Sequence, residues 1–212
     1  PRTTGKDGQL IATPKNDWTE GFYPGCLWYI YEHNREESWK QSAVKWTEAL
    51  EPMKKLTSHH DIGFLIYCSF GNGYRLTGKE EYKDVIIEAA NSLTTRFSEV
   101  TGCIKSWNYR KAWNGKDEWF YPVIIDNMMN LELLYFASKV TGDTRYAKIA
   151  TTHAETTAKN QLREDYSNYH VVDYDTLTGK VLHQATCQGF SDNSAWARGQ
   201  AWAIYGYTMV YR

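Results

Sequence analysis

The sequence predicts an all-α fold built from helical hairpins that stack side by side. Three observations predict it: apolar residues recur with helical periodicity in seven stretches, turn signals separate those stretches, and one turn motif recurs along the chain. A single helical hairpin cannot bury its inner face. Successive hairpins are therefore expected to stack into a solenoid or to close into an α/α toroid.

The periodic stretches occur in order at 21–33, 36–56, 61–76, 79–97, 127–140, 143–163 and 194–212. Turn signals between them include Asn34, Thr77-Gly78 and Thr141-Gly142. A loop rich in Trp and Gly is predicted over 99–120, and residues 168–182 are predicted to form a β-hairpin. Since no proline- or serine-rich linker divides the chain, we expect one domain over residues 1–212.

The turn motif marks an internal repeat. Residues 76–82, Leu-Thr-Gly-Lys-Glu-Glu-Tyr, align with residues 140–146, Val-Thr-Gly-Asp-Thr-Arg-Tyr, at an offset of 64. An Ala-rich amphipathic helix is predicted after each, and a weaker copy has Asn34 in the position of Thr77. A further copy stops at Tyr211-Arg212, so we expect the chain to be part of a larger ring.

The repeat also predicts a shared site. Counting back 15 or 16 residues from the three turns reaches the start of each hairpin's first helix, at Trp18, Asp61 and Asp126. Arg198 takes the same position in the last copy, because it precedes Tyr211 by 13 residues, as Asp61 precedes Tyr74. In a toroid, alternate helices point the same way, so these four side chains are expected to surround one mouth and to supply an aromatic platform, two carboxylates and a cation. Two carboxylates on opposite sides of a sugar are the usual equipment of a glycosidase.

Asp126 has an unusual local sequence. The aliphatic run Val123-Ile124-Ile125 precedes it and an apolar helical pattern follows it. Burial would raise the pKa of this carboxyl group and suit it to general-acid catalysis. The alternative is a helix cap, in which N–H bonds would lower the pKa. Both interpretations stay open from these residues alone.

Other polar residues have weaker signals. The neighbouring histidines His59 and His60 point about 100° apart on a helix, which disfavours a metal site. His170 begins an alternating strand, so either direction is open to its side chain. In the segment 188–202, Arg198 and Trp202 lie on one helix face, and Ser191, Asp192 or Asn193 is expected to cap that helix.

Composition excludes several classes of protein. The formal net charge of −1 offers no basic field for nucleic acid, and no apolar run reaches membrane-spanning length. The 9 Trp, 16 Tyr and 7 Phe residues suit either a core or stacking on sugars. The four cysteines lack metal-ligand spacing, so most are expected to be buried free thiols. We found no GxSxG elbow, phosphate loop or HExxH motif, and we expect no cofactor or metal.

Four separate motifs, in order, resemble the unsaturated glucuronyl hydrolases of glycoside hydrolase family 88. They are His60-Asp61-Ile62-Gly63-Phe64, Ile124 to Asn130, Tyr169 to Asp173, and Ser194 to Trp202. The resemblance covers the chain from about Asp17 onward. It implies an (α/α)6 barrel of twelve helices. About seven of these and a small β-hairpin would be present here, in a catalytic domain truncated at both ends.

The resemblance also implies a reaction. Such enzymes act on oligosaccharides that end in a 4,5-unsaturated uronate. An acid protonates C4 of the vinyl ether, water adds at C5, and the resulting hemiketal opens and releases the next sugar. By motif, Asp126 would be the acid and the base for the water, and Asp61 would hold the ring hydroxyls. The remaining substrate-binding residues would be His170, Gln188 and Arg198, with Trp18 and Trp202 as walls.

Different functions stay open from the sequence alone. The unsaturated rhamnogalacturonyl hydrolases of family 105 share the barrel and both aspartates, although the run Ala197 to Trp202 favours the glucuronyl family. A conventional inverting glycosidase would fit the same barrel, and so would a non-catalytic helical-repeat protein that binds glycans. The expected partner is a uronate-terminated oligosaccharide, with no nucleic acid and no membrane. Neither the oligomeric state nor the compartment, bacterial periplasm or cytoplasm, follows from the sequence.

Overall fold

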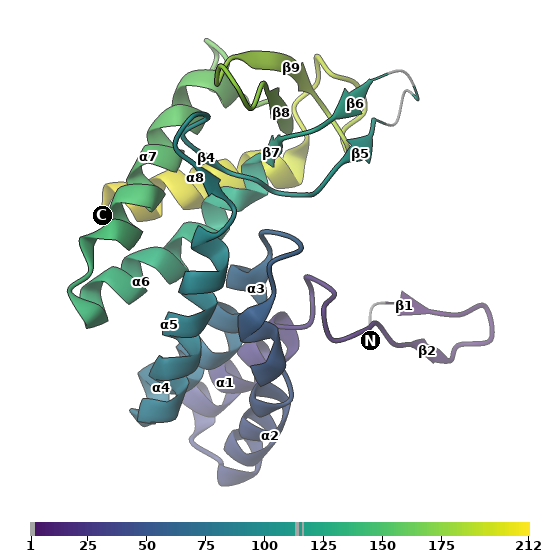
Figure 1. Ribbon diagram of the computed structural model, residues 1–212. Helices are drawn as coiled ribbons and strands as arrows, with labels where there is room; N and C mark the ends of the chain where they lie inside the picture. Colours follow the sequence, from purple (N-terminus) through teal and green to yellow (C-terminus); the bar gives the residue numbers. More distant parts are fainter. Residues whose placement is uncertain (1–2, 113–114, 116) are drawn as a thin grey trace. The chain divides into compact units, whose positions relative to one another are not determined.

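The computed structural model describes residues 3–112, 115 and 117–212 (Figure 1). Its contacts divide the chain into two compact units. One comprises Pro1–Leu56 and Ile62–Ala89, and the other comprises Thr57–Asp61 and Ala90–Arg212. The single domain expected over residues 1–212 stays a prediction. Residues 113, 114 and 116 of the predicted Trp-rich loop lie outside the described residues.

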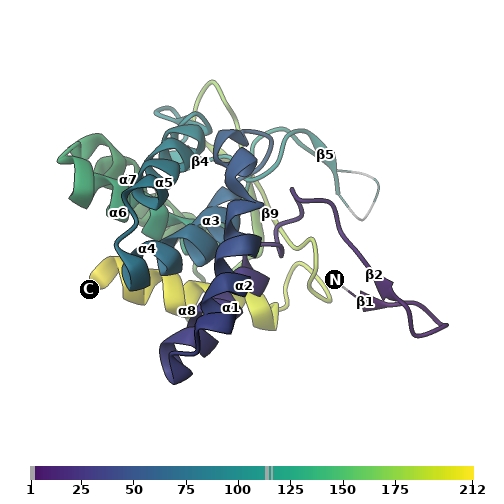
Figure 2. The same cartoon turned by 90° about the horizontal axis from the view of Figure 1, so that it is seen from below.

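The first unit is built around a pair of helices, α1 (Phe22–Asn34) and α2 (Glu37–Glu48), which pack side by side (Figure 2). A two-stranded hairpin, β1 (Thr3–Thr4) and β2 (Leu10–Ile11), precedes them, and a 3-10 helix, η1 (Glu51–Lys55), follows. Gly21 allows a close backbone approach, because a Cβ atom there would lie 2.0 Å from the Phe64 carbonyl oxygen.

The predicted helix over 61–76 is interrupted. It consists of α3 (Ile62–Ile66), a π-helical turn η2 (Tyr67–Gly71) and α4 (Asn72–Thr77). The buried Ser69 hydroxyl donates to the Leu65 carbonyl oxygen at 2.6 Å, inside this irregular region. Helix α5 (Glu80–Thr94) then runs from the first unit into the second.

The repeated turn motif is confirmed at the level of hydrogen bonds. Gly78 and Gly142 both adopt the left-handed conformation, with φ of 67° and 76°, and cap the preceding helix. The hydroxyls of Thr77 and Thr141 each donate back into the helix and accept the N–H two residues ahead. At the weaker copy, Arg35 takes the left-handed position with φ of 59°. The three turns are therefore structurally equivalent, although only two contain glycine.

The second unit contains a helical hairpin of α6 (Leu131–Thr141) and α7 (Thr144–Gln161), together with α8 (Ala197–Tyr211) (Figure 1). A 3-10 helix, η3 (Ile125–Asn130), leads directly into α6. Helix α8 packs closely against η3, since a Cβ atom on Gly206 would lie 2.4 Å from the Met128 Cβ.

A small sheet completes the second unit. Its three antiparallel strands, in the order β7-β8-β9, are β7 (Pro122–Ile124), β8 (Val171–Tyr174) and β9 (Val181–Ala185). Two short hairpins accompany it, β3 (Phe97–Ser98) with β4 (Cys103–Ile104) and β5 (Arg110–Lys111) with β6 (Glu118–Trp119). The β8–β9 hairpin confirms the prediction for 168–182.

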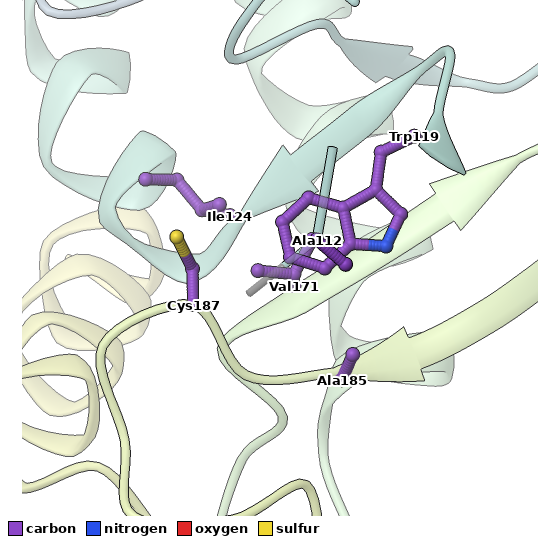
Figure 3. Packing of buried hydrophobic residues seen from close by; sticks show 6 residues of the cluster. All are labelled: Ala112, Trp119, Ile124, Val171, Ala185 and Cys187. Carbon is purple, nitrogen blue, oxygen red and sulfur yellow. The ribbon is translucent and has the colours of Figure 1, made fainter. Parts of the chain in front are cut away.

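Strand β7 explains the aliphatic run before Asp126. On one face of the sheet, Ile124 packs with Val171, Trp119 and Cys187, as Figure 3 shows. On the other face, Val123 packs in a separate buried cluster with Tyr121, Cys103, Val172 and Tyr174. A strand that is buried on both faces has a continuous apolar sequence rather than one in which apolar and polar residues alternate.

Two local predictions were wrong. Helix α8 begins at Ala197 with Trp196 as its N-cap residue, so none of Ser191, Asp192 and Asn193 caps it. The Asp192 carboxylate instead accepts the N–H of Thr186 at 2.8 Å. All four cysteines are free, but only Cys103 and Cys187 are buried, whereas Cys26 is exposed and Cys68 is half-buried. Within the described part of the chain, every helix is too short or too polar to cross a bilayer.

Candidate active site

Asp126 lies in the first turn of η3, directly after strand β7, and only 7% of its surface is exposed. The N-cap residues of η3 and α6 are Ile124 and Asn130, so Asp126 caps neither helix. Its Oδ2 atom is buried and lacks a hydrogen-bond partner among the described residues. The capping interpretation is therefore wrong, and a carboxyl oxygen is left available for a ligand.

Burial controls the pKa of Asp126. Loss of hydration raises this pKa most, and the negative charge of Asp61 raises it further. The backbone N–H of Asp126, the guanidinium of Arg198 and the indole N–H of Trp202 act in the opposite direction, but the pKa still reaches about 7. Near neutral pH, Asp126 is therefore present in both protonated and ionised forms.

His170 is held beside Asp126 by the main chain. Ile124 pairs with Val171 across β7 and β8, and the Ile125 N–H donates to the His170 carbonyl oxygen at 3.0 Å. The backbone N–H groups of Cys187 and Gln188 donate to His170 Nδ1 at 3.0 and 3.2 Å. Because Nδ1 accepts, the proton of a neutral ring must be on Nε2.

That Nε2 atom lies 3.6 Å from Asp126 Oδ2. Burial lowers the pKa of His170 to about 3, and the charges of Arg198 and Arg110 add to this effect. The imidazole is thus neutral at physiological pH and presents an N–H to the carboxyl group. The structure shows that the side chain of His170 points inward, where the sequence pattern left both directions open.

Asp61 is the second carboxylate of the site. Its Oδ2 lies 3.1 Å from His59 Nδ1, and its Oδ1 lies 3.3 Å from His60 Nε2. Burial alone would raise the pKa of Asp61, but the His60 and His59 rings and the Arg96 guanidinium outweigh burial and hold this pKa below its ordinary value. The two aspartates therefore differ in ionisation, which is the usual basis for separate acid and electrostatic roles.

A buried network fixes the two aspartates on the same framework. The His60 N–H donates to the Ser106 carbonyl oxygen at 3.1 Å, and the Ser106 hydroxyl accepts the Ile124 N–H at 2.9 Å. Asn127 donates to the Ile104 carbonyl oxygen at 2.7 Å, and the Ile104 N–H donates to His153 Nδ1 at 3.0 Å. Segment 103–106 thus ties the Asp61 loop to the turn that carries Asp126.

Gln188 and Arg198 lie together at the exposed side of the site. Arg198 Nη2 donates to Gln188 Oε1, and the guanidinium lies 4.4 Å from the centre of the Trp196 ring. Trp196 in turn stacks on His170, with ring centroids 4.3 Å apart and planes inclined by 34°. The sequence placed Arg198 and Trp202 on one face of a helix, and both residues belong to α8. Both also act on the Asp126 carboxyl group, whereas the contact of Arg198 with Trp196 was not predicted.

Sequence reasoning missed three residues around His170. Trp196 covers one face of the ring, and Trp107 meets it edge-on with centroids 6.3 Å apart and planes at 89°. Arg110 lies over Trp107, 4.5 Å from the ring centre. Trp196 was within reach of sequence reasoning, because it lies in the same motif as Arg198. Trp107 precedes the short strand β5 and Arg110 begins it, and neither belongs to a periodic stretch that could have identified it.

Trp18 belongs to the first unit. It packs against Phe22 and Phe64, with ring centroids 5.7 and 5.6 Å away. Because the other predicted site residues belong to the second unit, the convergence of Trp18 with them stays a prediction. Among the described residues, we found no group of three or more His, Cys, Asp or Glu side chains that could hold a metal ion.

Comparisons with known proteins place the chain in a family. The model of "Glycosyl Hydrolase Family 88" matches residues 2–212. An "Unsaturated glucuronyl hydrolase" of Formosa agariphila is 52% identical over 214 residues, an alignment that covers 100% of this chain and 52% of that protein. An "Unsaturated chondroitin disaccharide hydrolase" of Streptococcus agalactiae is 39% identical over 204 residues, covering 92% of this chain and 49% of that protein.

The fold comparison agrees with the sequence comparison. The crystal structure of an unsaturated glucuronyl hydrolase specific for heparin matches with a TM-score of 0.93 and 47% identity, over 100% of this chain and 55% of that chain. Such structures are (α/α)6 barrels, so the predicted fold class is confirmed. The chain spans about half the length of the curated relatives it matches. The chain belongs to glycosyl hydrolase family 88.

Proposed function

We propose that the protein removes a 4,5-unsaturated uronic acid from the non-reducing end of lyase-generated oligosaccharides such as glycosaminoglycan fragments. The observation that carries this proposal is the pair of aspartates whose pKa values are shifted in opposite directions. Asp126 has a pKa of about 7, while Asp61 has a lowered pKa. Protonation of a carbon atom requires an acid that retains its proton near neutral pH, and Asp126 meets this requirement.

The first step uses the protonated form of Asp126. Its carboxyl proton transfers to C4 of the vinyl ether, and the electron pair of the double bond forms the new C–H bond. The positive charge that develops at C5 is shared with the ring oxygen. Ionised Asp61 favours this charge electrostatically. His170 Nε2–H lies 3.6 Å from Asp126 Oδ2 and stabilises the carboxylate that is left.

The second step uses the ionised form of the same residue. The Asp126 carboxylate accepts a proton from water while the water oxygen bonds to C5. This addition restores the acid and gives a hemiketal, which opens and releases the next sugar. Arg198 and Gln188, which are joined by a hydrogen bond, supply the donors for the uronate carboxylate. We propose the indole of Trp202 as a wall of the uronate site, and the same role for Trp18 stays a prediction.

The test uses the full-length protein that contains this chain. We would incubate it with an unsaturated chondroitin or hyaluronan disaccharide and follow the ultraviolet absorbance of the double bond. Wild type is expected to remove the absorbance, and Asp126→Asn is expected to leave it unchanged. Release of sugar with the absorbance retained would instead indicate a conventional glycosidase. Binding without any turnover would indicate a glycan-binding protein.

A further inference from the structure

Two arginine–tryptophan pairs flank His170. Trp196 stacks on one side of the imidazole, 4.3 Å away, and Arg198 lies 4.4 Å from the centre of that indole. Trp107 meets the imidazole edge-on at 6.3 Å, and Arg110 lies 4.5 Å from the centre of the Trp107 ring. Arg198 is already assigned to the uronate, whereas the proposed mechanism gives Arg110 no role.

Arg110 is held in place from two directions. Its backbone belongs to β5, where it pairs with Trp119 of β6, and Trp119 is anchored in the buried cluster with Ile124 and Val171 (Figure 3). Its guanidinium is held by the face of Trp107, which packs against the same cluster. A guanidinium stacked on an indole keeps its N–H groups in its own plane, where they can form a fork toward an anion.

The charge of Arg110 is not matched within the site. No carboxylate among the described residues lies within ion-pair distance of its guanidinium. Glu118, on the strand that pairs with β5, accepts a hydrogen bond from the Tyr109 hydroxyl at 2.8 Å instead. The positive charge of Arg110 also reaches the centre of the site, because it contributes to the lowered pKa of His170.

We propose that Arg110 binds an anionic group of the sugar chain, a sulfate ester or a carboxylate, and so determines which oligosaccharides the enzyme prefers. The inference rests on the proposed function, since it treats the pocket beside His170 as a sugar site. Glycosaminoglycan fragments carry both kinds of anion. The planar fork of arginine matches the oxygen geometry of either group.

The test measures binding separately from turnover. Asp126→Asn prevents consumption of the ligand, so titration calorimetry can compare this variant with Asp126→Asn/Arg110→Gln. The ligands are two unsaturated disaccharides that differ only by one sulfate. Loss of a charge-assisted hydrogen bond at Arg110 is expected to raise Kd about 10- to 100-fold. A matched control is Arg145→Gln, which also removes an exposed arginine stacked on an aromatic ring, Tyr146, at 5.2 Å.

The change in Kd for each of the two disaccharides identifies the anion that Arg110 binds. A higher Kd for the sulfated disaccharide alone would assign Arg110 to the sulfate, and an equal rise for both would assign it to the uronate carboxylate. An unchanged Kd for both, with thermal unfolding like that of the parent variant, would overturn the proposal. Failure of the wild-type protein to remove the double bond would instead refute the proposed function, and the binding result would still decide the role of Arg110.

Discussion

Replacing Asp126 with asparagine should make the protein more stable near neutral pH while abolishing its activity. The pKa of Asp126 rises from an ordinary 3.8 to about 7 in the folded state. Between these values the folded chain retains a proton that the unfolded chain releases, so stability falls as pH increases through this window. At 1.36 kcal/mol per pH unit, the total cost of ionising Asp126 is about 4 kcal/mol. Asparagine does not ionise and avoids this cost.

Urea unfolding of the full-length wild type and Asp126→Asn, between about pH 5 and pH 8, measures the effect. The free energy of unfolding of the variant should exceed that of wild type by an amount that grows with pH and levels off above about pH 7. Asp61→Asn is the matched control with the opposite sign. The pKa of Asp61 is lowered, so its carboxylate stabilises the fold above its unfolded pKa, and this contribution is lost as pH falls. A stability difference for Asp126→Asn that does not change with pH would refute the raised pKa.

Two further substitutions test the surroundings of the acid. His170→Asn keeps a side-chain oxygen at the position of Nδ1 for the Cys187 and Gln188 N–H groups, but it removes the Nε2–H that faces Asp126. The kcat for double-bond loss should therefore fall about 10²-fold with little change in fold. An unchanged kcat would contradict the donor role. Gly206→Ala places a Cβ atom 2.4 Å from the Met128 Cβ, so α8 should shift. The free energy of unfolding should fall by about 1–3 kcal/mol. A urea midpoint equal to that of wild type would contradict the close packing.

The repeated turns and the burial of Asp126 were predictable because each has a local cause. A Thr-Gly pair combines a side-chain hydroxyl that bonds to the backbone with a residue that tolerates positive φ, and both properties are visible in the residue types. Arg35 shows the limit of this rule, since it adopts a φ of 59° without being glycine. Aliphatic residues before a carboxylate likewise indicate burial whatever the secondary structure.

Other parts of the site depend on distant partners. Strand β7 has three residues, too few to show a period, and it pairs with a strand that follows η3, α6 and α7. The tautomer of His170 is set by backbone N–H groups from another loop. The contacts of Trp107 and Arg110 arise from a short hairpin without a sequence signature. None of these relations is encoded in the spacing of neighbouring residues.

The pairing of β7 with β8 has a consequence for how this family can diversify. The acid follows one strand and His170 precedes the other, so backbone hydrogen bonds, including Ile125 N–H to the His170 carbonyl oxygen at 3.0 Å, set their separation. Arg110 and Arg198, which we propose to bind the sugar chain, lie on segments outside these two strands. Natural variation can therefore exchange these arginines while the backbone keeps Asp126 and His170 at the same separation, and such an exchange would act on the two groups only through their pKa values. This separation between residues fixed by strand pairing and residues on other segments lets substrate preference change during evolution.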